Sequence, residues 1–216
     1  MSVVVVDYGA GNLRSVAKAL EEASRINGEF EEVSITADPD IVARAERVVL
    51  PGDGAFPDCK RGLLAVDGLM DALNDAVNRR KVPFLGICIG MQLLATSGVE
   101  FEETQGFGWI PGRVERIQPV DISLKVPHMG WNTLEATREH DLLKGLPLGD
   151  AGLHAYFLHA FHLKALYSED VIAVADYGGP VTAAVARGNI AGTQFHPEKS
   201  QQLGLILLSN FLRWQP

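Results

Sequence analysis

The chain has 216 residues and a formal net charge of −8, with 47% hydrophobic and 21% charged residues. This composition is typical of a soluble globular protein with one sizeable core. The acidic balance, without a basic run, would repel phosphate backbones and anionic lipid surfaces, so we expect no nucleic-acid or membrane partner. No apolar stretch approaches the roughly 20 residues that span a bilayer, and the first residues lack a basic leader, so we expect a cytoplasmic protein.

Predicted strands and helices alternate along the first half of the chain. A β-branched run at residues 3–6 is followed by apolar residues at helical spacing, and this order recurs. Asp38, followed by Pro39, is typical of a helix N-cap and first turn. The expected strands are 3–6, 32–35, 47–50 and 82–87, and the expected helices include 13–23, 58–80 and 89–95. Apolar strands between amphipathic helices predict an α/β fold, with a mainly parallel open sheet covered by helices on both faces.

The pattern changes after Ser97 to short strand-like segments with frequent Gly and Pro. We expect several of these segments to pair antiparallel in a smaller section of the fold. They are residues 108–114, 124–126, 154–163, 171–177 and 182–186. The chain returns to a strand at 190–195 and a helix at 201–213, without an internal repeat or linker. We therefore expect residues 1–216 to form one domain.

The sharpest local signal is Gly86-Ile87-Cys88-Ile89-Gly90, where a predicted strand turns directly into a helix. This order predicts a nucleophile elbow with Cys in place of Ser, in which a tight turn needs neighbours without bulk. The helix N-terminus would stabilise negative charge on the sulfur. A buried structural cysteine between packing glycines is the alternative, and the pentapeptide alone leaves both open. A disulfide with Cys59 is possible in principle, but a reactive thiol fits a reduced, intracellular type of chain better.

A thiolate nucleophile needs a base, and the base needs an acceptor that orients it. His196 and Glu198 are the candidates, and Pro197 between them ends the predicted strand. Both side chains would therefore emerge at the carboxyl edge of the sheet, where the Cys88 turn also emerges. A lone histidine at a strand end is more often structural, but the His-Pro-Glu spacing together with the elbow favours a catalytic triad.

The elbow, the His-x-Glu ending and their separation resemble a class I, triad-type glutamine amidotransferase over essentially the whole chain. Five motifs are more specifically similar to the glutaminase subunits of imidazole glycerol phosphate synthases, namely residues 7–13, 51–56, 85–92, 127–132 and 195–200. The resemblance implies that Cys88 attacks the side-chain amide of glutamine and that His196 protonates the departing ammonia. Glu198 would orient His196, and water would hydrolyse the γ-glutamyl thioester.

The resemblance also assigns an oxyanion site to the backbone of Ile89 and to the strand that carries Gly52 and Asp53. Its glycines would let the strand approach the substrate closely, although an ordinary tight turn after residues 48–50 is the alternative. The family usually has Val where Asp53 stands. Because the donor would be a backbone group, Asp53 need not abolish activity, but it could change how easily the strand reorganises.

Four further residues are assigned by resemblance to the amino-acid head of glutamine: Gln92, Glu100, Ala160 and Phe161. Glu100 would balance the substrate ammonium, while an acid in a polar loop is ordinarily just solvated. The family more often has Ser or Thr and then Tyr at positions 160 and 161. We therefore expect the backbone, rather than the side chains, to make the contacts there.

Two other patterns do not predict a cofactor or a metal. Gly9-Ala10-Gly11 follows a strand, but Arg14 stands where a dinucleotide fingerprint needs its third glycine. His154, His159 and His162 are close in sequence, but on a strand they would scatter over both faces. We expect no cofactor and no bound metal.

The resemblance names a partner, a (β/α)₈-barrel cyclase that uses the ammonia to make imidazole glycerol phosphate and an aminoimidazole carboxamide ribotide in histidine biosynthesis. It places the heterodimer interface near Asn12, Met129, Trp131 and Lys199. Met129 and Trp131 in the core, and Lys199 as a solvated charge, are the alternatives. Three other functions stay open: an amidotransferase of another pathway, a hydrolase of γ-glutamyl compounds that acts alone, and an inactive regulatory module.

Overall fold

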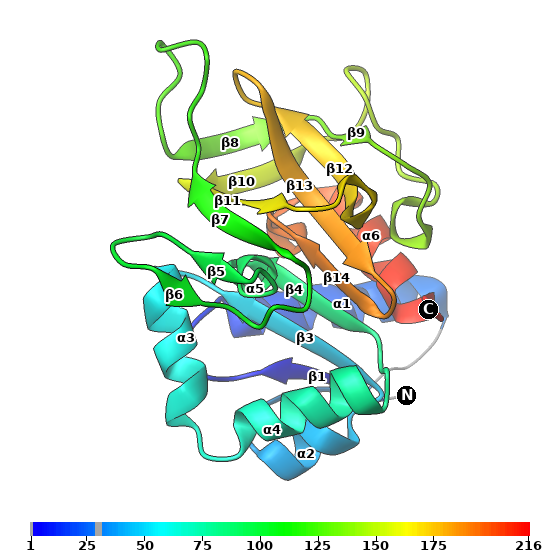
Figure 1. Cartoon of the computed structure of the whole chain (residues 1–216). Coiled ribbons are helices and arrows are strands. Elements are labelled where there is room, and N and C mark those ends of the chain that lie inside the picture. Colours follow the sequence, from blue (N-terminus) through cyan, green and yellow to red (C-terminus); the bar gives the residue numbers. More distant parts are fainter. Residues whose placement is uncertain (1, 29–31) are drawn as a thin grey trace.

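The main sheet of the molecule has eight strands in the order β2-β1-β3-β4-β14-β13-β12-β9 (Figure 1). The structure is a computed structural model that describes residues 2–28 and 32–216. The five strands from β2 to β14 run parallel. They are β2 (Glu32–Thr36), β1 (Ser2–Val6), β3 (Arg47–Gly52), β4 (Phe84–Cys88) and β14 (Ile190–Thr193). This confirms the predicted α/β class and the mainly parallel sheet.

The other three strands of this sheet run antiparallel to their neighbours. They are β13 (Pro180–Arg187), β12 (Val171–Asp176) and β9 (Glu135–Ala136). Two smaller sheets lie beside it. One pairs β8 (His128–Asn132) with β10 (Ala155–His159), and the other contains β11 (Phe161–Ala165), β7 (Gly112–Arg116), β5 (Ser97–Gly98) and β6 (Thr104–Gln105). The antiparallel pairs β8–β10 and β7–β11 confirm the predicted smaller section.

Helices cover the parallel part of the sheet on two sides. Helix α1 (Leu13–Asn27) packs against α6 (Gln201–Arg213), whereas α2 (Pro39–Arg44) packs against α4 (Leu69–Asn74). The chain steps from β1 to β2 in one direction and from β2 back past β1 to β3 in the other. Because such crossovers are right-handed, α1 and α2 lie on opposite faces, which leaves β1, β3 and β4 buried on both sides.

Several predicted elements differ from the structure. The helix expected at 58–80 is divided into α3 (Phe56–Ala65), α4 and a π-helical turn η1 (Asp75–Arg79), because Gly68 has a positive φ of 74° between α3 and α4. The helix at 89–95 is shorter, as α5 (Ile89–Gln92), because amides of residues 107, 108 and 110 bind the carbonyls of residues 93–95. The strand expected at 124–126 is wrong, since a turn at residues 121–124 leads into irregular backbone and β8 begins only at His128.

The predicted strand at 154–163 is interrupted at Ala160, so that β10 and β11 belong to different sheets. Short 3₁₀ helices complete the fold: η2 (Asp141–Leu143), η3 (Ser168–Asp170) and η4 (Pro197–Lys199). Among the residues that the structure describes, no helix is long and apolar enough to cross a bilayer. The fold brings the carboxyl ends of three parallel strands together, because Cys88 of β4 is in register with Gly52 of β3, and Ile87 with Thr193 of β14.

The predicted cap of α2 gives a test of the local structure. The Asp38 carboxylate accepts a hydrogen bond from the Asp40 amide at 2.9 Å. Replacing Asp38 with Ala should lower the free energy of unfolding by about 1 kcal/mol, measured by urea denaturation. Glu21→Ala, an exposed substitution on α1, is the control and should change little. Equal stability of Asp38→Ala and wild type would show that the cap does not support the helix.

Candidate active site

The turn between β4 and α5 has the geometry of the expected elbow. Cys88 has φ 55° and ψ −111°, a conformation that a non-glycine residue adopts only when its surroundings impose it. A Cβ atom on Gly90 would lie 1.9 Å from the Leu50 carbonyl oxygen, and one on Gly86 would lie 2.4 Å from the Gly90 oxygen. Side chains are therefore excluded on both sides of Cys88.

Cys88 and Cys59 are both free and buried. The Cys59 thiol donates a hydrogen bond to the Asp53 carbonyl oxygen at 3.0 Å, and burial is the main cause that raises its pKa to about 11. The Cys59 thiol is therefore protonated at neutral pH and is a poor nucleophile.

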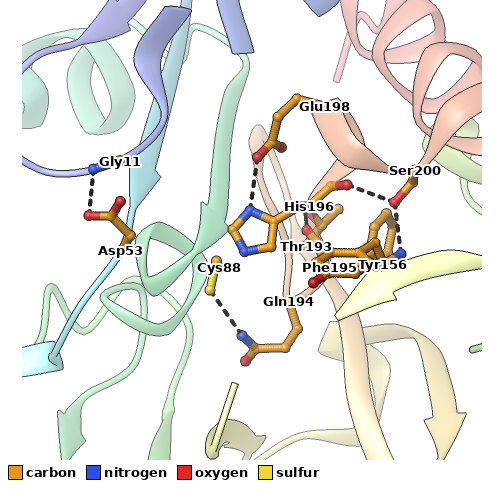
Figure 2. Close-up of polar contacts among 10 residues, drawn as sticks. All are labelled: Gly11, Asp53, Cys88, Tyr156, Thr193, Gln194, Phe195, His196, Glu198 and Ser200. Carbon is orange, nitrogen blue, oxygen red and sulfur yellow. Dashed lines mark hydrogen bonds and ion pairs between the residues drawn. The ribbon is translucent and has the colours of Figure 1, made fainter. Parts of the chain in front are cut away.

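His196 lies between Cys88 and Glu198, and its Nδ1 is 2.9 Å from Glu198 Oε1 (Figure 2). Both side chains are almost fully buried, with 9% and 1% exposed. Burial alone would lower the pKa of His196, but the Cys88 sulfur and the Glu198 carboxylate outweigh it and raise that pKa to about 9. The imidazole is therefore protonated on both nitrogens at neutral pH. It lies between the Cys88 sulfur and the Glu198 carboxylate, which can both be negatively charged.

The backbone of His196 is fixed against β10. Its amide donates to the Tyr156 carbonyl oxygen at 3.0 Å, and its own carbonyl oxygen accepts a hydrogen bond from the Ser200 hydroxyl at 2.6 Å. The Ser200 oxygen also accepts from the Tyr156 amide at 3.0 Å (Figure 2). These three bonds hold η4, and with it the His196 ring, in place.

A cavity of about 380 Å³ opens onto Cys88 and His196. Most residues that the sequence assigned to substrate, oxyanion and partner contacts line it: Asn12, Asp53, Ile89, Gln92, Glu100, Ala160, Phe161 and Lys199. Gly52 and Glu198 are not among its lining residues. Met129 and Trp131 lie on β8 and are 66% and 49% exposed, so the alternative that they are core residues is wrong.

The strand expected to form part of an oxyanion site is held from behind by three residues. Tyr8 donates its hydroxyl to the Pro51 carbonyl oxygen at 2.8 Å, and Gly11 donates its amide to Asp53 Oδ1 at 2.8 Å. Cys59 binds the Asp53 carbonyl oxygen, as described above. Because β3 continues in register with β4 through Gly52, this segment is not an ordinary turn after residues 48–50.

The residues expected to bind the head of the substrate lie at one end of the cavity. Gln92 Nε2 donates to the Phe161 carbonyl oxygen at 2.8 Å, while Gln92 Oε1 is buried and has no hydrogen-bond partner among the described residues. Glu100 Oε2 accepts from the Phe56 amide at the start of α3, at 2.8 Å. The cavity therefore presents the fixed Glu100 carboxylate to a cationic group, while the Gln92 amide oxygen is buried.

Three contributors were not predicted from the sequence. Gln194 Nε2 is 3.7 Å from the Cys88 sulfur, and Tyr8 holds the strand at Pro51. His159, which the sequence pattern did not predict as a metal ligand, has its Nδ1 2.8 Å from the Phe161 oxygen. Burial lowers the pKa of His159 to about 3, so this nitrogen is the N–H donor of a neutral ring. Gln194 could have been recognised, because it lies only two residues before His196 in the segment that follows β14.

Within the part of the chain that the structure describes, no group of three or more His, Cys, Asp or Glu residues is arranged to hold a metal ion. The site therefore presents cysteine, histidine, carboxylate and amide groups, which are suited to covalent acyl transfer with acid-base assistance.

A model of the class-I glutamine amidotransferases matches residues 4–213. The chain therefore belongs to the class-I glutamine amidotransferase family.

Two relatives show where the chain lies within this family. It is 58% identical over 216 residues to the imidazole glycerol phosphate synthase subunit HisH of Rhodopseudomonas palustris, and 57% identical to that of Mesorhizobium japonicum. Each alignment covers 100% of both chains. Within the family, this similarity groups the chain with the HisH subunits.

Solved structures support the fold alone. A structure described as a glutamine amidotransferase superposes with a TM-score of 0.70 at 21% identity and covers 97% of both chains. A glutamine amidotransferase from Thermotoga maritima gives a TM-score of 0.66 at 14% identity, covering 99% of this chain and 96% of that one.

The coupling of His196 to Glu198 can be tested by titration. Replacing Glu198 with Gln removes the carboxylate charge, so the pKa of His196 should fall from about 9, as measured by NMR of labelled histidine side chains. His140, whose pKa is lowered mainly by burial, serves as the control in the same spectra and should not move. An unchanged pKa of His196 would contradict the coupling.

The same substitution should change how stability depends on pH. A raised histidine pKa stabilises the folded protein fully below the unfolded value of 6.5, and this contribution is lost as the pH rises through about 9. The difference in unfolding free energy between wild type and Glu198→Gln should therefore become smaller as the pH rises from about 6.5 to about 9.

Proposed function

We propose that the chain is the glutaminase subunit of an imidazole glycerol phosphate synthase, which hydrolyses glutamine to glutamate and ammonia. The observation that carries the proposal is that Cys88 and His196 line one cavity and that Glu198 binds the His196 ring from behind. The full-length similarity to HisH subunits supports the choice of synthase. Residues 1–216 act as one amidotransferase domain in the cytoplasm, without a cofactor.

The proposed reaction is covalent. The Cys88 sulfur adds to the side-chain carbonyl carbon of glutamine, and His196, which is protonated at neutral pH, gives its proton to the departing ammonia. Glu198 orients the imidazole and stabilises its charge. Water then adds to the thioester carbonyl with His196 as base, which releases glutamate and restores the thiolate and imidazolium.

The oxyanion that forms at the carbonyl needs N–H donors placed in advance. In this proposal they come from the Ile89 backbone at the start of α5 and from the strand at Gly52 and Asp53. Each such donor contributes about 2.7–4 kcal/mol to the transition state. In this proposal the ammonium of glutamine binds Glu100, and Gln92 together with the backbone at Ala160 and Phe161 completes the substrate site.

The proposed partner is a (β/α)₈-barrel cyclase, with which the chain forms a heterodimer. In water near neutral pH, ammonia is largely protonated to ammonium, which is not a nucleophile. Its transfer to the cyclase therefore needs a path from which water is excluded. Exposed Met129 and Trp131 on β8, together with Asn12 and Lys199 at the cavity, form the proposed interface. The cyclase would use the ammonia to make imidazole glycerol phosphate and an aminoimidazole carboxamide ribotide in histidine biosynthesis.

Glutamine hydrolysis with and without the cyclase and its ribotide substrate tests this proposal. Wild type should be faster in the loaded complex, and Cys88→Ala should lose about 10⁴-fold or more in kcat in every condition. Cys59→Ser, which keeps a donor to the Asp53 carbonyl oxygen, is the matched control and should keep most of the activity. Retained activity in Cys88→Ala would show that Cys88 is not the nucleophile. Equal wild-type rates in all conditions would contradict the coupling to a synthase.

Lys199 tests the interface. The side chain is exposed, and its ammonium lies 5.9 Å from the centre of the Tyr156 ring. Lys199→Glu should weaken complex formation by about tenfold or more, measured by titration calorimetry, because it reverses a charge at the cavity rim. Lys144→Glu makes the same change at an exposed site beside α6 and should leave the affinity unaltered. Equal affinities for both variants and wild type would place the interface elsewhere.

A further inference from the structure

Gln194 lies against the nucleophile on the side away from Glu198 (Figure 2). It directly follows β14, it is fully buried, and its Nε2 is 3.7 Å from the Cys88 sulfur. It precedes His196 by two residues, and both side chains point toward Cys88 (Figure 2). The sulfur is therefore contacted by an imidazole and by an amide.

The orientation of the Gln194 amide follows from its neighbours. A backbone carbonyl oxygen can only accept hydrogen bonds, and the oxygen of Phe161 is bound at 2.8 Å by both Gln92 and His159. Gln92 must therefore turn its NH₂ group to this side. That NH₂ group also lies 3.1 Å from Gln194 Oε1, which leaves the NH₂ of Gln194 facing the sulfur.

We propose that Gln194 is a functional donor to the nucleophile: its amide N–H holds the Cys88 sulfur in the thiolate form and directs it toward the cavity. A hydrogen bond to the charged form of a group favours that form, and the effect is larger in a buried site. The proposal deepens the proposed function, on which it rests, since it concerns the same cysteine.

The network also gives this donor a fixed geometry. Gln92, Gln194 and His159 are all buried, and the amide orientation of Gln194 depends on the carbonyl of Phe161, in the segment proposed to bind substrate. A shift of the Phe161 carbonyl would therefore alter the contact with the Cys88 sulfur through the side-chain amides of Gln92 and Gln194. This arrangement distinguishes Gln194 from a side chain that only fills space behind Cys88.

The test compares Gln194→Met, which keeps the length of the side chain but has no N–H, with wild type. The rate of Cys88 alkylation by iodoacetamide is followed against pH in the full chain by peptide mass spectrometry. The pH of half-maximal rate should rise by about one unit in Gln194→Met. In the complex with the cyclase, kcat for glutamine at neutral pH should fall about tenfold, while KM changes less than about twofold.

Thr193→Val is the matched control. Thr193 is the neighbouring buried residue, and its hydroxyl donates to the Phe195 carbonyl oxygen at 3.0 Å without contacting the sulfur (Figure 2). This variant should lose stability but keep the wild-type alkylation profile. Gln194→Glu, which keeps the shape and the acceptor for Gln92, is the second test if Gln194→Met is poorly folded. Its added negative charge should move the profile upward at least as far.

The outcomes separate the two proposals. Wild-type protein that does not hydrolyse glutamine in the complex would overturn the proposed function. If wild type is active and the Gln194 variants have the same alkylation profile as wild type, only the role of Gln194 is overturned. An equal upward shift in Thr193→Val would do the same, because it would trace the effect to general disturbance of the segment.

Discussion

The close approach of β3 to the β4–α5 turn is the constraint on which the site depends. Leu50 and Gly90 come so near that any side chain at position 90 would overlap the Leu50 carbonyl oxygen. The same approach places Gly52 in register with Cys88. The proposed nucleophile, the first residue of α5 and the strand proposed for the oxyanion site therefore lie next to one another. Because β14 pairs with β4 on its other side, the segment after β14 brings His196 to that point as well.

Polar side chains buried at this edge of the sheet hold the site together. An amide without a partner in such surroundings costs free energy, so Gln92 and Gln194 are fixed by each other and by the Phe161 carbonyl. The backbone of the His196 turn is fixed in the same way, by β10 and Ser200. Among the described residues, the buried Gln92 Oε1 remains without a hydrogen-bond partner.

Local patterns predicted much of this molecule. The parallel strands are continuous apolar runs in the sequence, and these runs predicted the class of fold. The elbow and the His-Pro-Glu ending are recognisable motifs at strand ends, so the order of the strands predicted that Cys88 and His196 lie close together. The early end of α5 did not, because distant loop amides bind the carbonyls that would have continued the helix. The contacts of Tyr8 and Gln194 likewise depend on side-chain directions that appear only in the folded chain.

Asp53 shows how a departure from a family pattern acquires a physical meaning. The valine that is usual in the resembled family could not accept the hydrogen bond that Gly11 donates to the Asp53 carboxylate. Gly11 itself has a φ of 96°, and a Cβ atom there would lie 2.8 Å from Pro51, so the loop after β1 fits closely against the strand. The loop and the strand are therefore joined twice, by packing and by a hydrogen bond. Asn12 follows Gly11 in that loop and lines the cavity. Because Gly11 is bound to Asp53, a displacement of Asn12 would also move the strand that carries Asp53.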